Sequence, residues 1–295
     1  MSGARDLLLD HLGSGVTTVC RAWSVTRTDG VIYGFTDHDL DLNFDGMTFK
    51  ASTGMTARGF QQSTGLSVDN SEAVGGFSDE AITEADLRAG RFDAAEVRSW
   101  LVNWRDVDQR LEQFSGNFGE ISHSGGMFKA ELRGLSDRLN QLQGRVYQSS
   151  CSAVLGDAKC GFDLTQTGYR VDAEIRSFGP LGQMQFSGLL PLADRWFERG
   201  KLVMLSGAAQ NLIGVIRTDR VTASGRDIDL WLDLGAKVAV GDLVRLEAGC
   251  DRQAATCRAK FTNFLNFRGF PSIPGDDWLS SYPVSYKAND GGSLG

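Results

Sequence analysis

Residues 16–35 read VTTVCRAWSVTRTDGVIYGF and carry the clearest folding signal in the chain. Polar and apolar side chains alternate along 16–26, which is the period of a β-strand with one buried face. Asp29-Gly30 then supplies the residues of a two-residue hairpin turn, since both central positions of that turn favour a left-handed backbone. A second strand over 31–35 completes the predicted hairpin.

The alternating pattern continues on both sides of this hairpin. Residues 40–45 alternate between apolar and polar side chains, and Asp45-Gly46 turns the chain into residues 47–51, which predicts a second hairpin. Further strands are predicted at 96–104, 169–178, 182–189, 201–205, 211–220, 227–234 and 242–247, with another hairpin over 115–134. Short helices are predicted at 4–12, 79–90 and 135–142, and residues 55–78 are predicted to be a loop or a weak strand pair.

The composition also favours a β-rich fold. The chain has 295 residues, of which 36 are Gly and only 5 are Pro, and abundant glycine suits tight hairpins and bulges. A chain of this length is expected to form two domains. Because the character of the sequence changes after residue 144, we predict a mainly β protein with short helices, divided into an N-terminal β-rich domain at 1–145 and a C-terminal β-rich domain at 146–295.

Charge and motifs argue against several classes of function. The net charge of -7 has the wrong sign for a protein that binds nucleic acid over its general surface. No apolar run approaches 18 residues, and residues 1–15 lack the features of a secretory signal, so we expect neither a membrane span nor a leader. With only three His and no Walker loop, HExxH helix or G-x-S-x-G elbow, the chain is not expected to be an enzyme.

Four of the five cysteines form two closely spaced pairs. Cys151 and Cys160 bound the loop CSAVLGDAKC, and Cys250 and Cys257 bound CDRQAATC. Two such loops can direct their thiolates to one point and build a four-thiolate site for zinc or an iron–sulfur cluster. Structural zinc sites use tighter spacings, so these pairs favour the larger cluster. Two disulfides, or four unrelated buried thiols, are the alternatives.

Two other features are interpreted as packing. Cys20 lies inside the first predicted strand, at a position that needs a small buried hydrophobic side chain. Four Phe residues within 261–270 are spaced three apart, but a glycine and two prolines nearby prevent a continuous helix. We therefore expect these rings to hold an irregular loop against the β core beside the cysteine site. A docking edge for a partner protein is the alternative.

Two blocks at opposite ends of the chain carry a family resemblance. The first comprises VCRAWSVTRTDGVIYGFTDHD at 19–39 with FDGMTFKA at 44–51, and the second is GCDRQAATCRAKFTNFLNFRGFPSIPG at 249–275. Together they resemble the tail hub proteins of siphophage-like particles, in the branch found in gene transfer agents and related prophages. The second block is the more specific, because it combines a fixed cysteine spacing with the NFRGFP run.

The resemblance implies hub-type β-barrel domains, two similar barrels in each chain, and a homotrimer that presents a pseudo-sixfold ring. Hub proteins of this type, including the lambdoid tail-tip protein, are associated with a [4Fe–4S] cluster on four cysteines. By this resemblance the metal ligands and cofactor-binding residues would be Cys151, Cys160, Cys250 and Cys257, which would make the C-terminal domain a cysteine and iron–sulfur region. Zinc is the alternative metal.

We therefore expect a structural virion protein, the baseplate hub, forming a trimeric ring that joins the distal tail and tube to the tail tip and lets DNA pass. The expected partners are the distal tail protein ring, the tail-tip or central fibre protein, the tape measure protein, and DNA that passes without specific binding. The expected location is the virion, at the tail tip or baseplate, after assembly in the bacterial cytoplasm. An iron–sulfur electron carrier or a tail-tip cell-wall hydrolase is the alternative function.

Overall fold

The computed structural model describes residues 3–51, 55–56, 70–76, 83–124, 127–134, 144, 146–189, 191–223 and 225–273. The chain divides into two compact units, Met1–Gln143 with Leu234–Lys237, and Gly144–Asp233 with Val238–Gly295. Both units are built mainly of β-strands, as the sequence predicts. The assignment of distinct domains to 1–145 and 146–295 stays a prediction.

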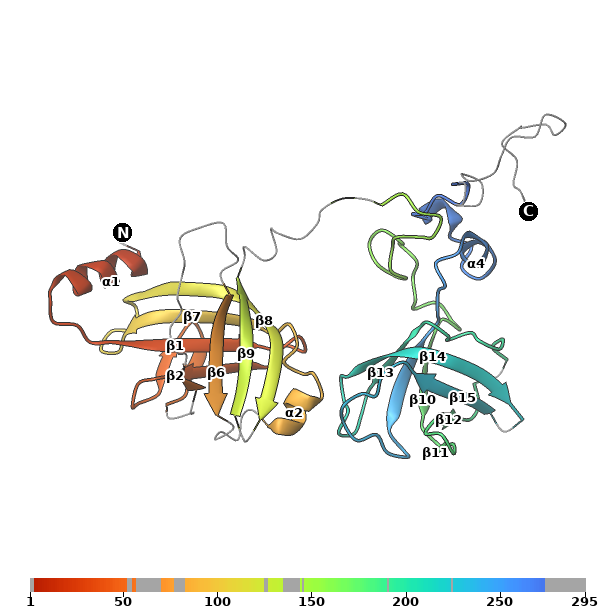
Figure 1. Ribbon diagram of the computed structural model, residues 1–295, viewed down its shortest axis with the longest axis horizontal. Helices are drawn as coiled ribbons and strands as arrows, with labels where there is room; N and C mark the ends of the chain where they lie inside the picture. Colours follow the sequence, from red (N-terminus) through yellow and green to blue (C-terminus); the bar gives the residue numbers. More distant parts are fainter. Residues whose placement is uncertain are drawn as a thin grey trace. The chain divides into compact units, whose positions relative to one another are not determined.

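The first unit contains a seven-stranded antiparallel sheet in the order β2-β1-β7-β8-β9-β6-β5 (Figure 1). Its strands are β1 (Val19–Thr26), β2 (Ile32–Thr36), β5 (Met55–Thr56), β6 (Asn70–Gly76), β7 (Glu96–Asn103), β8 (Arg110–Ser124) and β9 (Met127–Gly134). A separate hairpin pairs β3 (Leu42–Phe44) with β4 (Met47–Phe49). Lys50 forms hydrogen bonds with Gly34 and Thr36 of β2, and β5 begins five residues later at the other end of the sheet. Lys50 therefore lies beside β2, one end strand of the sheet, and the chain forms the other end strand, β5, only five residues later.

The predicted hairpins of this unit are confirmed. β1 pairs with β2, and Gly30 in their turn has a φ of 87°. β3 pairs with β4 through Asp45 and Gly46, whose φ angles are 51° and 73°. Because both residues of the second turn are left-handed, Asp-Gly supplies the chemistry that this turn needs. The strands predicted at 96–104 and within 115–134 are confirmed as β7, β8 and β9.

The helices follow the sequence pattern only in part. α1 (Ala4–Gly13) confirms the predicted N-terminal helix. α2 (Glu84–Arg88) is shorter than the helix predicted over 79–90, because it begins after Thr83, whose hydroxyl caps it by accepting a hydrogen bond from the N–H of Asp86. Residues 57–69, 79–82 and 135–142, which carry parts of the predicted loop and helices, lie outside the described part of the chain. No helix in the described residues is long and apolar enough to cross a membrane.

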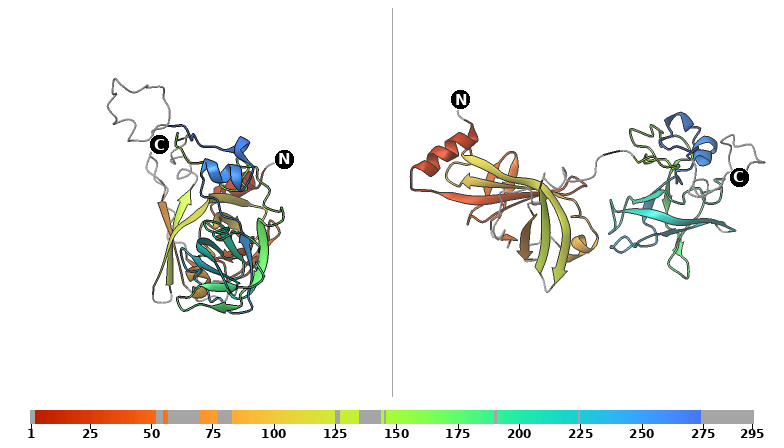
Figure 2. Two further views of the ribbon diagram at one scale, coloured as in Figure 1. Left: turned by 90° about the vertical axis from the view of Figure 1, so that its right-hand side faces the viewer. Right: turned by 45° about the horizontal axis from the view of Figure 1, so that its top comes forward.

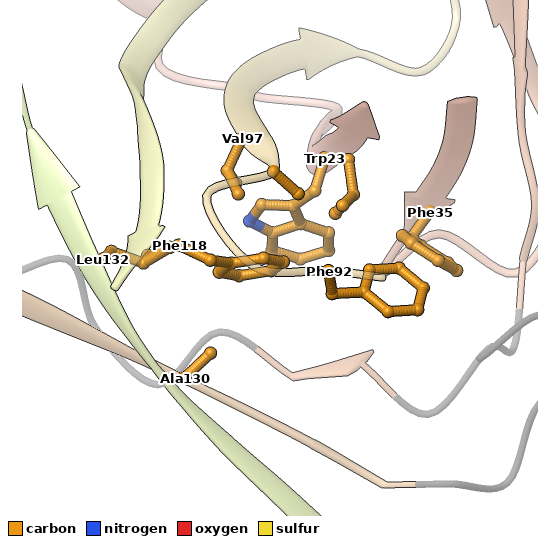
Figure 3. Packing of buried hydrophobic residues seen from close by; sticks show 9 residues of the cluster. Trp23, Phe35, Phe92, Val97, Phe118, Ala130 and Leu132 are labelled. Carbon is orange, nitrogen blue, oxygen red and sulfur yellow. The ribbon is translucent and has the colours of Figure 1, made fainter. Parts of the chain in front are cut away.

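The core of the first unit gathers aromatic and aliphatic side chains from several strands (Figure 3). Trp23 of β1, Phe35 of β2 and Phe118 of β8 are all buried, and Phe92, which precedes β7, packs with them. The other buried members of this cluster are Val25, Ala95, Val97, Ala130 and Leu132. Alternate side chains of a strand point to the same face, so the period-2 pattern of residues 16–26 places Trp23 and Val25 together.

Cys20 is a core residue of the first unit, as predicted. It is 8% exposed and clusters with Phe44, Phe49 and Trp100. Its thiol donates a hydrogen bond to the carbonyl oxygen of Val102, at 3.6 Å. Burial raises the pKa of this thiol to about 11, which keeps it protonated and unreactive. Cys20 therefore has a packing role, separate from that of the other four cysteines.

The second unit contains another seven-stranded antiparallel sheet, in the order β10-β16-β13-β14-β15-β12-β11. Its strands are β10 (Arg170–Glu174), β11 (Ser177–Phe178), β12 (Met184–Phe186), β13 (Lys201–Met204), β14 (Ile213–Thr222), β15 (Gly225–Leu230) and β16 (Leu243–Glu247). All six predicted strands of this half are present, although β12 is shorter than the predicted 182–189 and the predicted strand 169–178 is divided into β10 and β11.

This second sheet closes on itself. The two strands at the ends of its order, β10 and β11, are separated in the chain by only Ile175 and Arg176. The N–H of Ile175 bonds to the carbonyl oxygen of Asp242, beside β16, whereas the N–H of Arg176 bonds to that of Gln185 in β12. The two end strands are thus consecutive in the chain, one paired with β16 and the other with β12, which closes the sheet into a barrel.

A buried ion pair attaches a long loop to this barrel. The side chains of Asp219 on β14 and Arg226 on β15 are 0% and 1% exposed, and their closest atoms lie 2.6 Å apart. Asp219 Oδ2 also accepts a hydrogen bond from the N–H of Phe197 at 2.7 Å. The Arg226 guanidinium donates to the carbonyl oxygens of Leu192 and Ala193. The pair therefore fixes the loop between β12 and β13 against the barrel.

Removing one member of this pair is expected to be costly. In Asp219→Ala the guanidinium of Arg226 stays buried without its counter-charge, and we expect the free energy of unfolding to fall by about 3–5 kcal/mol. Urea unfolding of the full chain measures this loss. The matched control is Asp229→Ala, which breaks the more exposed pair between Arg217 and Asp229 and is expected to cost at most about 1 kcal/mol. Equal losses in the two variants would contradict the role given to Asp219.

Candidate metal centre

Four cysteines from separate segments line one recess in the second unit. Cys151 and Cys160 lie in the loop before β10, Cys250 follows β16, and Cys257 lies on α4 (Ala254–Ala259). The loop with the first two cysteines, in green, lies beside α4, in blue (Figures 1 and 2). The recess encloses about 350 Å³, part of it open to solvent. Its other lining residues are Ala153, Leu155, Arg252, Gln253, Phe261, Asn263, Asn266 and Phe267.

The structure thus brings together all four cysteines that the sequence singles out. All of them are free thiols, so neither pair forms a disulfide here. One local expectation is wrong. Cys257 was predicted to end an irregular loop, but it lies on α4, because the residues 254–259, AATCRA, form a short helix of residues that mostly favour helix.

The first cysteine loop is organised by one carboxylate. Asp157 Oδ1 accepts hydrogen bonds from the N–H groups of Lys159 at 2.9 Å and Cys160 at 2.6 Å, and its Oδ2 accepts one from Val154 at 2.9 Å. The backbone oxygen of Asp157 accepts a further bond from Gly161. The bonds from Val154 and Cys160 hold the pKa of Asp157 below its usual value. These hydrogen bonds fix the backbone of the loop around the carboxylate and thereby position Cys160.

The second cysteine loop is organised in a similar way. Asp251 accepts hydrogen bonds from the N–H of Gln253 at 2.9 Å and from the hydroxyl of Thr256 at 2.7 Å, which fixes the chain where α4 begins. Just before it, the backbone of Gly249 runs against that of Glu198. A Cβ on Gly249 would lie 1.7 Å from the carbonyl oxygen of Glu198, so only glycine fits. This close approach sets the direction in which Cys250 leaves the barrel.

Three of the four sulfur atoms accept a hydrogen bond from nitrogen. Such bonds favour the thiolate form of a cysteine, and hydrogen bonds to the sulfurs are one of the determinants of the properties of iron–sulfur sites. Two of the donors are backbone groups and one is a side chain. They are Arg268 N–H to Cys151 Sγ at 3.3 Å, Arg252 N–H to Cys250 Sγ at 3.4 Å, and Asn263 Nδ2 to Cys160 Sγ at 3.5 Å.

The thiols also influence one another electrostatically. Burial raises the pKa of Cys250, and negative charge at Asp251, Cys151 and Cys160 raises it further. Burial raises the pKa of Cys257 too, with a contribution from the other three cysteines. Four thiolates in this recess would therefore repel one another unless a positive group lay between them. A coordinated metal supplies such charge and deprotonates its thiol ligands.

Four cysteine thiols around one recess are a suitable type of donor for zinc or for an iron–sulfur cluster. Among the described residues, no three His, Cys, Asp or Glu side chains lie close enough to hold one metal ion. Around one zinc ion the sulfurs would lie about 4 Å from one another, since each Zn–S bond is about 2.3 Å long. A cluster of several irons instead holds its cysteines farther apart. The four thiols of the recess supply the donor type that both groups use.

An aromatic cluster connects this recess with the barrel. Phe261, which follows α4, is 4% exposed and contacts Phe162 edge to face, with ring centroids 5.0 Å apart. Tyr169 lies against both rings, and its hydroxyl donates to the carbonyl oxygen of Lys260 at 2.6 Å. Phe264 stacks on Phe267, and Phe267 lines the recess. The Phe residues therefore hold the C-terminal segment beside the cysteines, as expected from the sequence.

Sequence reasoning missed three residues that shape this site. Asp157, Asn263 and Lys260 all contact the cysteine segments, but none is a metal ligand and none belongs to a recognisable motif. Asp157 had the best signal, since it begins the turn DAKC. The contacts of Asn263 and Lys260 depend on tertiary structure: Asn263 bonds to the carbonyl oxygen of Cys160, 103 residues earlier.

Comparisons with known proteins agree with this architecture. A family model described as "Baseplate hub protein, N-terminal attachment domain" matches residues 5–163, more than half of the chain. A second, described as "Phage conserved hypothetical protein BR0599", matches residues 195–277. The first match contains Cys151 and Cys160, and the second contains Cys250 and Cys257.

A chain in the solved structure of the "Virion of native gene transfer agent (GTA) particle" is 55% identical to this chain. The match covers 97% of this chain and 99% of that chain, with a TM-score of 0.88. No curated protein matches. The predicted resemblance to the tail hub proteins of gene transfer agents and the predicted location in the virion are thereby confirmed, and the chain belongs to the baseplate hub protein family.

Proposed function

We propose that this chain forms the homotrimeric hub ring of a tail baseplate, in which a four-cysteine [4Fe–4S] cluster stabilises the C-terminal half. The ring would join the distal tail protein ring and the tube to the tail-tip or central fibre protein, beside the tape measure protein, and would let DNA pass. Near-complete coverage of a virion chain at 55% identity supports the structural role. The single observation that supports the cluster is the shared recess of the four cysteines.

The strand architecture supports a ring of pseudo-sixfold character. Each unit holds one seven-stranded sheet, so three chains would contribute six sheets of similar size. In both units, the two end strands of the sheet are contacted or formed by residues that lie only a few positions apart in the chain. Such a ring could meet a sixfold assembly on one side and a threefold assembly on the other. Closed rings need self-complementary contacts, which bury large areas in obligate assemblies.

The net charge of -7 is compatible with a ring through which DNA slides. A lumen rich in lysine and arginine would bind phosphates and release counterions, which retains DNA and slows its passage. An acidic chain avoids this retention. DNA would therefore be a passing substrate of the channel, with no specific binding site on the hub.

When bound, the cluster would supply iron–thiolate bonds that cross-link the loop 151–160 to the segment 250–257. These segments are about 100 residues apart in the chain. Bound metal groups of this kind contribute their binding free energy to folding. The residues around the recess would then do the remaining work: Asp157 and Asp251 shape the two loops, and Asn263 donates to the Cys160 sulfur. No redox turnover is needed for this structural role.

Neither alternative function is favoured by a specific observation. His11 accepts a hydrogen bond from the N–H of Thr18, and His38 accepts one from the N–H of Leu40, so both rings stabilise local backbone. His123 lies in β8. A cell-wall hydrolase would need a nucleophile or base in a substrate cleft, and the cysteines of the recess have no His in its lining.

Metal and sulfide analysis of protein purified without air tests the cluster. We expect about four irons and four sulfides per chain, lost in Cys250→Ser because one thiolate ligand is removed. Cys20→Ala is the matched control, since Cys20 is buried in the core of the first unit and does not line the recess of the second, and it should keep the full iron content. One zinc per chain would replace the proposed metal. Metal-free protein with paired disulfides would refute the four-thiolate site.

Light scattering coupled to size exclusion tests the ring. At micromolar concentration we expect a mass three times that of one chain, and the trimer should persist at high salt if its contacts are mostly apolar. The distal tail protein from the same particle should shift the complex to a larger mass. A chain that stays monomeric both alone and with that protein would contradict the hub ring, whatever its metal content.

A further inference from the structure

Lys260, the residue after α4, has an unusual environment for a charged side chain. Its ammonium donates hydrogen bonds to the carbonyl oxygens of Trp196 and Gly249, the latter at 2.8 Å. The same group lies 4.3 Å from the centroid of a Trp196 ring and 5.4 Å from that of Phe261. Carbonyl oxygens and aromatic faces thus surround the charge, and within the described part of the chain no carboxylate forms an ion pair with it.

Charged groups in such environments normally have a partner of opposite charge. Two carboxylates, Asp219 and Asp251, act on Lys260 through their charge without forming an ion pair with it. Asp219 is paired with Arg226 and accepts a bond from Phe197. Asp251 is held by Gln253 and Thr256. Both carboxylates favour the charged form of Lys260, but less than negative charge at Cys250 does, and Arg226 offsets that of Asp219.

The cysteine recess offers a further and stronger source of negative charge. Gly249, whose carbonyl oxygen accepts a bond from the Lys260 ammonium, is the residue directly before Cys250. Cys250 and Phe261 both line the recess. Lys260 precedes Phe261 in the chain and bonds to the residue before Cys250, so it lies next to two lining residues without lining the recess itself. Burial lowers the pKa of Lys260 to about 8, and negative charge at Cys250 is the largest charge effect acting in the opposite direction. A group with four thiolates in the recess would therefore favour the charged lysine.

We propose that Lys260 is the half-buried counter-charge of the four-thiolate group, a positioning residue that binds no metal itself. Its ammonium stabilises the negative charge of the loaded site through a medium of low dielectric, where charges act more strongly than in water. Its bonds to Trp196 and Gly249 hold that charge in place. This inference rests on the proposed cluster. Because reduction of the cluster adds one negative charge, Lys260 favours the reduced state.

The reduction equilibrium of the cluster in the full chain tests this role. In Lys260→Met we expect the equilibrium constant for one-electron reduction to fall about tenfold, which is about 59 mV for a one-electron couple. Lys260→Arg keeps the charge and should change the constant much less. The matched control is Lys159→Met, which removes an exposed charge directly before Cys160. Solvent screens that charge, so the control should match the unmodified chain.

The rate of iron loss to a chelator provides a second measurement. Lys260→Met and Lys260→Gln should lose iron about tenfold faster than Lys260→Arg, although Gln can still donate hydrogen bonds to the two carbonyl oxygens. If both neutral variants are purified without iron while Lys260→Arg retains it, the counter-charge role is supported. If Lys260→Arg also loses its iron, the geometry of lysine is what matters, and the proposal is wrong.

Two results separate this inference from the cluster on which it rests. Iron absent from the unmodified chain would refute the proposed cluster. Iron present, with a reduction equilibrium and iron-loss rate that are equal in Lys260→Met and Lys159→Met, would leave the cluster intact and overturn the role of Lys260.

Discussion

The buried pair of Asp219 and Arg226 is the constraint on which the second unit depends. Through Phe197 it fixes the loop between β12 and β13, and the neighbouring residue Trp196 then accepts a bond from Lys260. A continuous series of hydrogen bonds therefore runs from the interior of the barrel to the segment that carries Cys257. Buried ion pairs add little net stability compared with apolar packing. What this one supplies is position, since it fixes an irregular loop that has no strand pairing of its own.

The two cysteine loops show how local hydrogen bonds can shape an irregular backbone. Asp157 and Asp251 are near the cysteines in sequence, and each directs its carboxylate to nearby donors of its own loop, mostly backbone N–H groups. Local hydrogen bonds therefore offset much of the entropy lost when the loops become ordered, so the proposed metal group would have less of it to offset. Contacts between the loops complete the arrangement, as when the N–H of Cys151 bonds to the carbonyl oxygen of Arg252.

Local chemistry decided which parts of the fold could be predicted from the sequence. The turn at Asp45-Gly46 was predictable because those two residues alone favour its backbone angles. The strands followed from side-chain alternation, whereas the start of α2 depends on the hydroxyl of Thr83, which accepts a hydrogen bond from the N–H of Asp86. The four cysteines could be identified from spacing and family resemblance. Asn263 and Lys260 could not, since their partners are distant in sequence and are brought near only by the aromatic cluster and the buried pair.

The switch of pairing partner at Ile175 and Arg176 has a consequence for how copies of this chain can coexist at high local concentration. A sheet that ends in free strands exposes unpaired N–H and C=O groups, and neighbouring copies can add to it edge to edge. In the second unit one stretch of chain occupies both ends of the sheet. Any contact between copies through this barrel would therefore use side chains and loops, and crowded copies would not pair here strand edge to strand edge.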